Sequence, residues 1–196
     1  MKLAMPVYIA LLRGVNVVGN NKIKMDQLRL LFDSIGLKQA LTYIQSGNVL
    51  FKSKDKDSKK LEGKIETAIE KRFGFRPRVI VRVSSQLDEV IERNPFAART
   101  DIEPNKLLVT FLATDPGEDV RRKVREIKGS PEELYIDGCE MFTYYPDGVG
   151  QSKLPVKLIE KTLGTPGTAR NWNTLLKLRE MSKAMESKPD VTGITP

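Results

Sequence analysis

The most informative stretch of the chain, residues 7–25, reads Val7-Tyr-Ile-Ala-Leu-Leu-Arg-Gly-Val-Asn-Val-Val-Gly-Asn-Asn-Lys-Ile-Lys-Met25. Its first six residues are all apolar, a pattern typical of a strand that is buried on both faces. A loop rich in Gly and Asn follows. A second, largely apolar run, Leu107-Leu-Val-Thr-Phe-Leu112, begins later in the chain. The elements that follow each run therefore indicate whether the chain contains one structural unit twice.

The first run is followed by alternating helical and extended patterns. The hydrophobic periodicities and turn residues predict two helices, three further strands and a short closing helix. These predicted elements are a helix at 25–35, strands at 40–44 and 49–52 joined by the turn 45–48, a helix at 58–73, a strand at 76–83 and a helix at 85–92. Gly36 and Gly74 are typical stops for the two longer helices.

The second run is followed by the same order of elements. They are a helix at 118–127, a hairpin of 134–136 with 141–144, a helix at 152–163, a brief strand at 167–169 and a helix at 171–185. Each half thus has the strand-helix-strand-strand-helix-strand order of the ferredoxin-like fold. We expect an α+β fold made by tandem duplication of a ferredoxin-like (βαββαβ) subdomain, with antiparallel sheets and helices on one face.

The predicted domain boundary lies where prolines interrupt all periodicity. Pro95 and Pro104 bracket this stretch, as is typical of a linker. We expect subdomain 1 at residues 1–94, a linker at 95–104, subdomain 2 at 105–186 and a flexible tail at 187–196. Helices cover only one face of such a sheet, so either the other half or a second copy in a homodimer must cover the other face.

Composition excludes several kinds of chemistry. The 196 residues include no His and a single Cys, Cys139, which excludes a Ser-His-Asp triad, a Cys-His dyad, imidazole zinc ligands and an internal disulfide. We expect no metal and no cofactor, and Cys139 reads as a small hydrophobic residue beside a turn. The absence of a leader and of a membrane-spanning apolar run predicts a cytoplasmic protein with no membrane partner.

The net charge of +8 is concentrated in the first half. Residues 1–95 contain 18 Lys and Arg against 10 Asp and Glu, whereas residues 96–196 contain 15 of each sign. Between Lys52 and Arg82 there are 11 basic and 5 acidic residues. Such a surface favours RNA, DNA or other polyanions. A solvated face that aids solubility is the alternative.

The loop after the first strand suggests an anion site. Gly and Asn admit backbone conformations that point several N–H groups at one place, as in anion-binding nests. Arg13 and Lys22 add positive charge on either side of this loop. An ordinary connection between a strand and a helix remains the alternative.

Five stretches carry a family resemblance. They are Tyr8–Val17, Asn20–Met25, Thr42–Val49, Ser152–Leu154 and Arg170–Thr174. Together they resemble the bacterial family catalogued as domain of unknown function 1697, over roughly residues 6–180, although the chain departs from the usual pattern at Val18 and Gln151. The resemblance implies a duplicated ferredoxin-like fold and brings no established biochemical activity.

The ferredoxin-like topology brings these polar motifs together at strand ends. The loop after the first strand and the turn after the second share one edge, and Ser152, a candidate helix N-cap, shares an edge with the last strand of its half. If the two edges face each other, one cleft gathers the candidate ligand-binding residues. They are Arg13, Gly14, Asn16, Asn20, Asn21, Gln45, Ser46, Asn48, Ser152, Lys153, Arg170 and Asn171.

Three classes of function stay open at this point. The first is binding of an anionic small molecule that bears phosphate or carboxylate, nucleotides included. The second is RNA or DNA binding by the basic first half. The third is an enzyme that uses Lys153, Tyr144 or Tyr145 as acid or base. Local structural roles remain the alternative for each residue, such as Asn171 capping the last helix. The chain is expected to be a monomer or a homodimer.

Overall fold

The computed structural model describes residues 5–17, 21–127 and 131–189. In these ranges the fold is mixed α+β, with six α-helices and two antiparallel sheets of four strands. The chain divides into two compact units, residues 1–88 with 178–196 (unit 1) and residues 89–177 (unit 2). Residues 178–186 therefore belong to unit 1, whereas the sequence assigned them to subdomain 2. None of the helices in the described ranges has the length and hydropathy needed to cross a membrane.

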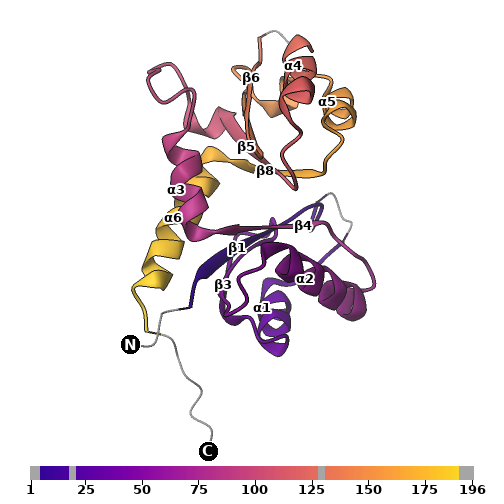
Figure 1. Ribbon diagram of the computed structural model, residues 1–196, viewed down its shortest axis with the longest axis vertical. Helices are drawn as coiled ribbons and strands as arrows, with labels where there is room; N and C mark the ends of the chain where they lie inside the picture. Colours follow the sequence, from indigo (N-terminus) through magenta and orange to yellow (C-terminus); the bar gives the residue numbers. More distant parts are fainter. Residues whose placement is uncertain (1–4, 18–20, 128–130, 190–196) are drawn as a thin grey trace, which may run out of the picture. The chain divides into compact units, whose positions relative to one another are not determined.

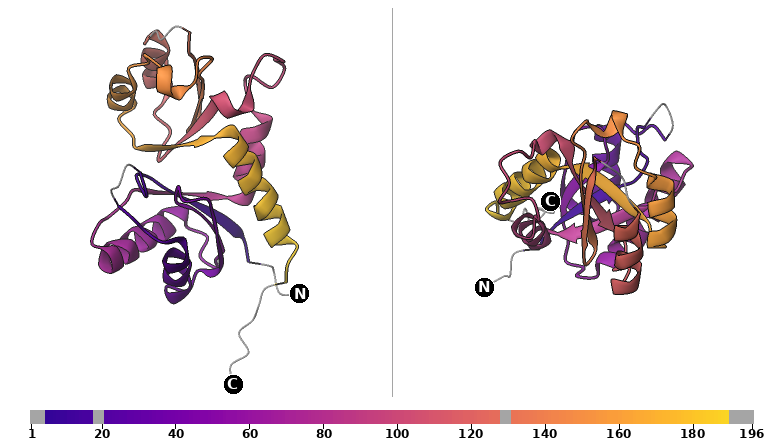
Figure 2. Two further views of the ribbon diagram at one scale, coloured as in Figure 1. Left: turned by 180° about the vertical axis from the view of Figure 1, so that it is seen from behind. Right: turned by 90° about the horizontal axis from the view of Figure 1, so that it is seen from above.

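Unit 1 contains a sheet with the strand order β2-β3-β1-β4 and two covering helices. Its elements are β1 (Val7–Leu12), α1 (Met25–Ser34), β2 (Lys38–Tyr43), β3 (Asn48–Lys52), α2 (Ser58–Phe73) and β4 (Val79–Val83). The central strand β1 pairs antiparallel with both β3 and β4. Helices α1 and α2 lie on the same face of this sheet (Figures 1 and 2). The element order matches the sequence-based expectation.

The core of unit 1 forms between this helical layer and the sheet. All six residues of β1 are buried, as the unbroken apolar run predicts. Tyr8, Ala10 and Leu12 belong to the core cluster that the two helices share. The Phe51 ring packs against Tyr8 at a centroid distance of 5.6 Å and against Phe32 at 5.4 Å. Alternation along β1 therefore turns every second residue toward the helices.

Strand β4 is an edge strand whose outward N–H groups are satisfied by side chains. Glu66 Oε1 accepts a hydrogen bond from the Val79 N–H at 3.0 Å, and Glu62 Oε1 accepts one from the Val81 N–H at 3.0 Å. Both carboxylates extend from α2 and are buried. Glu66 also pairs with Arg76 at 3.1 Å. An open strand edge invites pairing with another chain, and these glutamates occupy it.

Two further helices, α3 (Ser84–Glu92) and α6 (Trp172–Glu186), contribute residues to unit 1. Within unit 1, Ser84 Oγ donates to Ser182 Oγ at 2.8 Å. Arg179 Nε donates to the Asp88 carboxylate at 2.7 Å, and this hydrogen bond is the main reason why the pKa of Asp88 is lowered. The last part of the described chain thus bonds to residues that precede unit 2.

Unit 2 contains a sheet with the strand order β6-β7-β5-β8, the same order as in unit 1. Its elements are β5 (Leu107–Leu112), α4 (Glu118–Glu126), β6 (Glu133–Asp137), β7 (Glu140–Tyr144), α5 (Val156–Leu163) and β8 (Gly167–Asn171), with 3-10 turns at Pro104–Lys106 and Val149–Gln151. Helices α4 and α5 pack together on one face, over a core that includes Leu112 and Ile159 (Figure 1).

Several predicted element boundaries shift, two of them by three residues or more. The helix expected at 152–163 begins at Val156, and its N-cap is Pro155 instead of Ser152. A residue before proline is disfavoured in the helical region, so Leu154 ends any extension toward Ser152. The strand expected at 76–83 begins at Val79. The tail prediction for residues 190–196 lies outside the described ranges.

Candidate functional site

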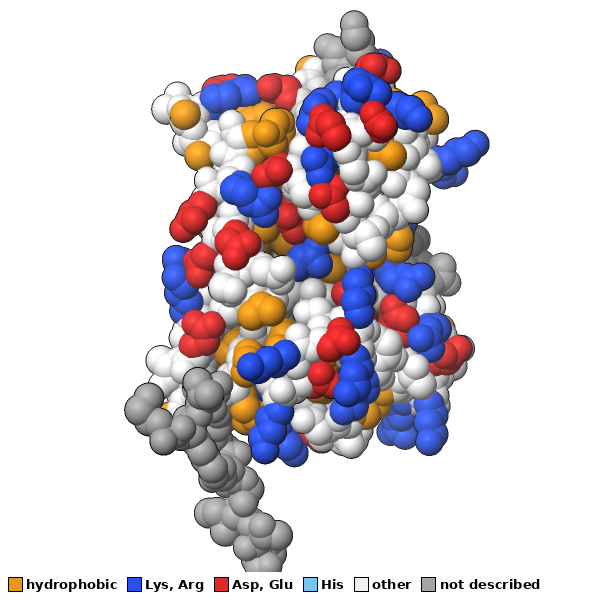
Figure 3. Space-filling model, in the orientation of Figure 1, with side chains coloured by type: hydrophobic (Ala, Val, Ile, Leu, Met, Phe, Trp, Pro, Cys, Tyr) orange, Lys and Arg blue, Asp and Glu red, His pale blue; other side chains and the backbone are white. Residues whose placement is uncertain are grey.

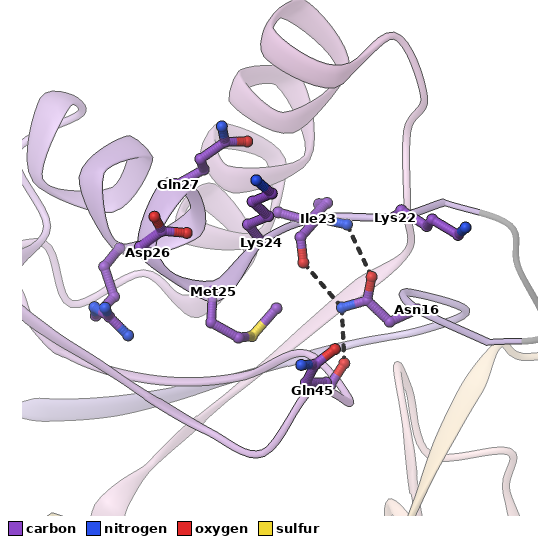
Figure 4. Close-up of a pocket in the computed structure, with 9 residues that line it drawn as sticks. Asn16, Lys22, Ile23, Lys24, Met25, Asp26, Gln27 and Gln45 are labelled. Atoms are coloured by element: carbon purple, nitrogen blue, oxygen red, sulfur yellow. Dashed lines mark hydrogen bonds between the residues drawn. The ribbon is translucent and has the colours of Figure 1, made fainter.

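The loop after β1 is held by the side chain of Asn16. Its Nδ2 donates to the backbone oxygens of Ile23 at 3.0 Å and Gln45 at 2.9 Å, and its Oδ1 accepts from the Ile23 N–H at 2.8 Å (Figure 4). Asn16 adopts a φ of 57°, in the left-handed region that Asn tolerates. One side chain therefore ties the loop both to the start of α1 and to the β2–β3 turn.

The neighbouring loop residues bond to one another. Asn21 Nδ2 donates to the Gly14 oxygen at 3.1 Å, and the Asn16 N–H donates to the Asn21 oxygen at 3.2 Å. Gly14 and Asn21 also have positive φ values, 70° and 53°. These groups shape the loop itself, so the backbone nest expected from the sequence is at least partly filled by internal bonds. Asn20 lies outside the described residues.

The turn between β2 and β3 lies against the same loop. The Leu12 N–H donates to the Gly47 oxygen at 2.9 Å, and Asn48 Nδ2 donates to the Tyr43 oxygen and to Ser46 Oγ. Together with the bond from Asn16 to Gln45, these contacts confirm that the two loops share one edge. Ile44 has a φ of 48°, which is a strained conformation for a β-branched residue.

A pocket of about 710 Å³ opens at this edge, where α1 begins. It is lined by Asn16, Lys22, Ile23, Lys24, Met25, Asp26, Gln27, Arg29 and Gln45. Of the candidate ligand-binding residues, Asn16 and Gln45 contribute to the lining, as does Lys22, which the sequence analysis named for its positive charge beside the loop. Arg13, Gly14, Asn21 and Ser46 belong to the flanking loops, and Asn48 begins β3. Sequence reasoning missed Ile23 and the lining residues from Lys24 to Arg29, although a helix start preceded by lysines was a visible signal.

The start of α1 has no side-chain cap. Lys24 occupies the N-cap position and makes no capping hydrogen bond. The first amides of a helix have no partner within the helix, and those of Met25, Asp26 and Gln27 find none elsewhere in the described ranges. A helix start carries positive potential because its peptide dipoles align. The pocket therefore combines N–H donors that have no protein partner in the described ranges with a positive field.

The charged side chains of the pocket reinforce this field only in part. Lys22 and Lys24 are exposed and extend in different directions from the chain (Figure 4). Arg29 Nη1 donates to Thr42 Oγ1 at 2.9 Å, which ties the guanidinium to β2. Asp26 is the one acid in the lining. Three cations and one carboxylate leave a positive balance.

The four predicted site residues of unit 2 bond to other groups of the same unit. Ser152 Oγ accepts from the Leu154 N–H at 3.0 Å, and the Lys153 N–H donates to Glu132 Oε1 at 3.2 Å. Asn171 Oδ1 accepts from the Asn173 N–H at 3.0 Å, which caps the start of α6. Arg170 differs from the other three residues in its burial, because it is only 7% exposed.

The buried guanidinium of Arg170 donates to Thr168 Oγ1 and to the Ala169 oxygen, both at 2.8 Å. Burial lowers its pKa to about 10, because the charged form loses its hydration. The side chain remains protonated near neutral pH. A common site formed by these residues and those of unit 1 stays a prediction.

Individual side chains bear on the two alternative functions, nucleic-acid binding and catalysis. Lys52 and Arg82, which bound the basic stretch, are buried with 1% and 7% exposure, so neither is an exposed phosphate contact. Burial is the main cause that raises the pKa of Tyr145, which makes its phenolate scarcer near neutral pH. The Tyr144 hydroxyl donates to the Asp101 oxygen. In the described ranges no cluster of three or more His, Cys, Asp or Glu residues could hold a metal ion.

Comparisons with known proteins place the chain in a family. A comparison with curated proteins finds no significant match. Conserved bacterial protein SP0830 from Streptococcus pneumoniae has a solved structure similar to this one, with 27% identity and a TM-score of 0.66. The similarity covers 91% of this chain and 99% of that chain. The model of the family described as protein of unknown function (DUF1697) matches residues 5–142. The chain therefore belongs to the DUF1697 family.

Proposed function

We propose that this protein binds an anionic small molecule in the pocket at the start of α1. The ligand class is a phosphate- or carboxylate-bearing compound, nucleotides included. The observation that carries the proposal is the uncapped first turn of α1 within a pocket of about 710 Å³. Helix starts bind anions because their N–H groups point at the ligand while the dipole favours negative charge.

The residues around the helix start support the same ligand class. The amides of Met25, Asp26 and Gln27 are the donors for an anion, and Lys22 and Lys24 raise the local concentration of negative ligands. The side-chain amide of Gln45 lies at the same rim. The strained backbone of Ile44 beside it is a further support, since strain of this kind gathers at ligand sites.

We also propose that each half of the chain is a ferredoxin-like subdomain that arose by tandem duplication. Both sheets have the same strand order, each with two helices between corresponding strands. The element order of each half is βαββαβ before its closing helix. This order is the sequence-level signature of the ferredoxin-like fold.

Two substitutions with opposite expected effects on anion binding test the pocket. Lys24→Ala is expected to weaken the binding of inorganic phosphate or AMP by about tenfold, because a charge-assisted contact is lost. Asp26→Asn is expected to strengthen the same binding, since it removes the one carboxylate in the lining. Isothermal titration with phosphate, AMP and succinate at low ionic strength measures both changes.

Lys56→Ala is the matched control, because this exposed lysine of unit 1 lies outside the pocket lining. It should leave the affinity within about twofold of the original, as expected for an exposed charge. Equal losses for Lys24→Ala and Lys56→Ala would show nonspecific attraction to net charge. No heat of binding with any of the three anions would overturn the proposal.

A further inference from the structure

A second concave surface of unit 1 lies between α1 and α2 and forms a groove of about 930 Å³. Its apolar part includes Leu31 and Ile35 of α1 with Ala68 of α2. Its charged side chains are Lys60, Lys64, Lys71 and Arg72 of α2, together with Asp55. The groove shares no lining residue with the pocket at the start of α1.

Helix α2 separates its charges by sign. Glu62 and Glu66 accept hydrogen bonds from backbone N–H groups of β4. Glu70 pairs with Arg76 at 2.9 Å. Most of the cations that line the groove form no salt bridge in the part of the chain that the structure describes. Lys60 pairs with Asp55 at 2.9 Å, but Lys64, Lys71 and Arg72 form no salt bridge within the described residues.

The surface shows the same imbalance. Lys and Arg side chains gather over the α1 and α2 part of the face shown in Figure 3, with fewer Asp and Glu side chains among them. Lys71 and Arg72 also lie in the last turn of α2, where cations favour the helix dipole. That effect does not account for Lys64, which lies in the middle of the helix. A partner with negative charge would complement all of these cations.

Gly63 is an independent sign of a partner. It lies inside α2 and lines the groove, and a Cβ atom added there would meet nothing within 4 Å. Glycine is unfavourable in a helix interior, and no packing in the described part of the chain requires it. A glycine on a concave surface allows another chain to approach the helix backbone closely.

We propose that this groove docks an acidic amphipathic helix of a partner protein. The groove between two helices suits a third helix that lays apolar side chains on Leu31, Ile35 and Ala68. Its flanking carboxylates would face Lys64, Lys71 and Arg72. The apolar part favours a peptide over nucleic acid, because no aromatic side chain lines the groove to stack on a base.

The test measures fluorescence anisotropy of a labelled helical peptide with Leu at i and i+4 positions and Glu at the flanking positions. The double variant Lys64→Glu with Lys71→Glu is expected to weaken binding more than tenfold, because two attractions become repulsions. Lys157→Glu with Lys161→Glu makes the same charge change on exposed residues of α5 in unit 2. This control should change the affinity less than threefold.

Substitutions at Gly63 separate docking from folding. Gly63→Ala is expected to raise the melting temperature by a few degrees, because alanine favours the helix and its Cβ has space. Gly63→Gln should keep the chain folded and weaken peptide binding about tenfold by filling the groove. A merely structural glycine would not give stability and binding effects of opposite sign.

Four results would overturn the proposal. They are no binding of the peptide to the unsubstituted protein, equal binding by the Lys64/Lys71 double variant, tighter binding of a mixed oligonucleotide that depends on Lys64 and Lys71, and self-association that the same double variant abolishes. The third would assign the groove to nucleic acid and the fourth to a second copy of the chain. Light scattering measures the last of these.

Discussion

Gly47→Ala is expected to lower the free energy of unfolding by about 2–4 kcal/mol, through backbone strain together with a steric clash. Gly47 has a φ of 71°, and a Cβ atom there would lie 2.8 Å from the Leu12 Cβ. Neither atom lies at the end of a flexible side chain, so the turn must move. That movement would also weaken the bond between the Leu12 N–H and the Gly47 oxygen. Chemical denaturation measures the loss.

Gly14→Ala is the matched control for this clash. Gly14 has nearly the same φ, 70°, but an added Cβ would meet nothing within 4 Å. Its cost should be limited to the left-handed conformation, about 1 kcal/mol. The difference between the two variants isolates the contact with Leu12. Equal losses would show that the β2–β3 turn yields without penalty.

Glu66→Ala is expected to lower the free energy of unfolding by about 2–3 kcal/mol, because it leaves the buried Val79 N–H without an acceptor and removes the carboxylate that pairs with two arginines. Glu66 accepts from the Val79 N–H and pairs with Arg76 at 3.1 Å and Arg78 at 3.6 Å. Denaturation in urea gives the total loss. Hydrogen exchange at the Val79 amide reports whether the β4 edge has become open to water.

Two companion variants divide this effect into its parts. Glu66→Gln retains an oxygen for the Val79 N–H but loses the charge, so its cost should be about half of that for alanine, since part of the penalty is the unmade hydrogen bond. Glu70→Ala removes an exposed carboxylate one turn further along α2 and should cost less than about 1 kcal/mol. A loss for Glu66→Ala no larger than for Glu70→Ala would contradict the role assigned to the β4 edge.

The sequence predicts the order of elements well, because hydrophobic periodicity directly reflects which residues face the core. The helix predicted at 25–35 spans Met25–Ser34, and the apolar run at 7–12 is a fully buried strand. Periodicity alone did not predict the start of the helix near Ser152, because the position of a proline decides it. The Ser152 side chain suits a helix cap, yet Pro155 decides where the helix can begin.

The candidate site was less predictable, since its shape depends on contacts between distant residues. The sequence predicts that Asn16 is a loop residue that tolerates unusual backbone angles, and the structure shows it in a loop with a φ of 57°. Its bond to Gln45, 29 residues away, brings the turn beside the start of α1 and completes the pocket rim. Arg82 shows a second limit. Alternation assigns it to the sheet face opposite Val81, but only the folded chain shows that this residue is buried.

The division of the chain has a consequence for synthesis on the ribosome. Unit 1 is built from two separated segments, and its last described contacts come from residues that are translated after all of unit 2. Asp88 is bonded to Arg179, and Ser84 is bonded to Ser182. The buried amine of Lys52 donates to the Lys188 oxygen at 2.8 Å. In each pair the second residue is translated much later than the first. The first half can form its sheet early. Its final bonds, however, close only near the end of translation, so premature termination within α6 leaves the N-terminal unit incomplete.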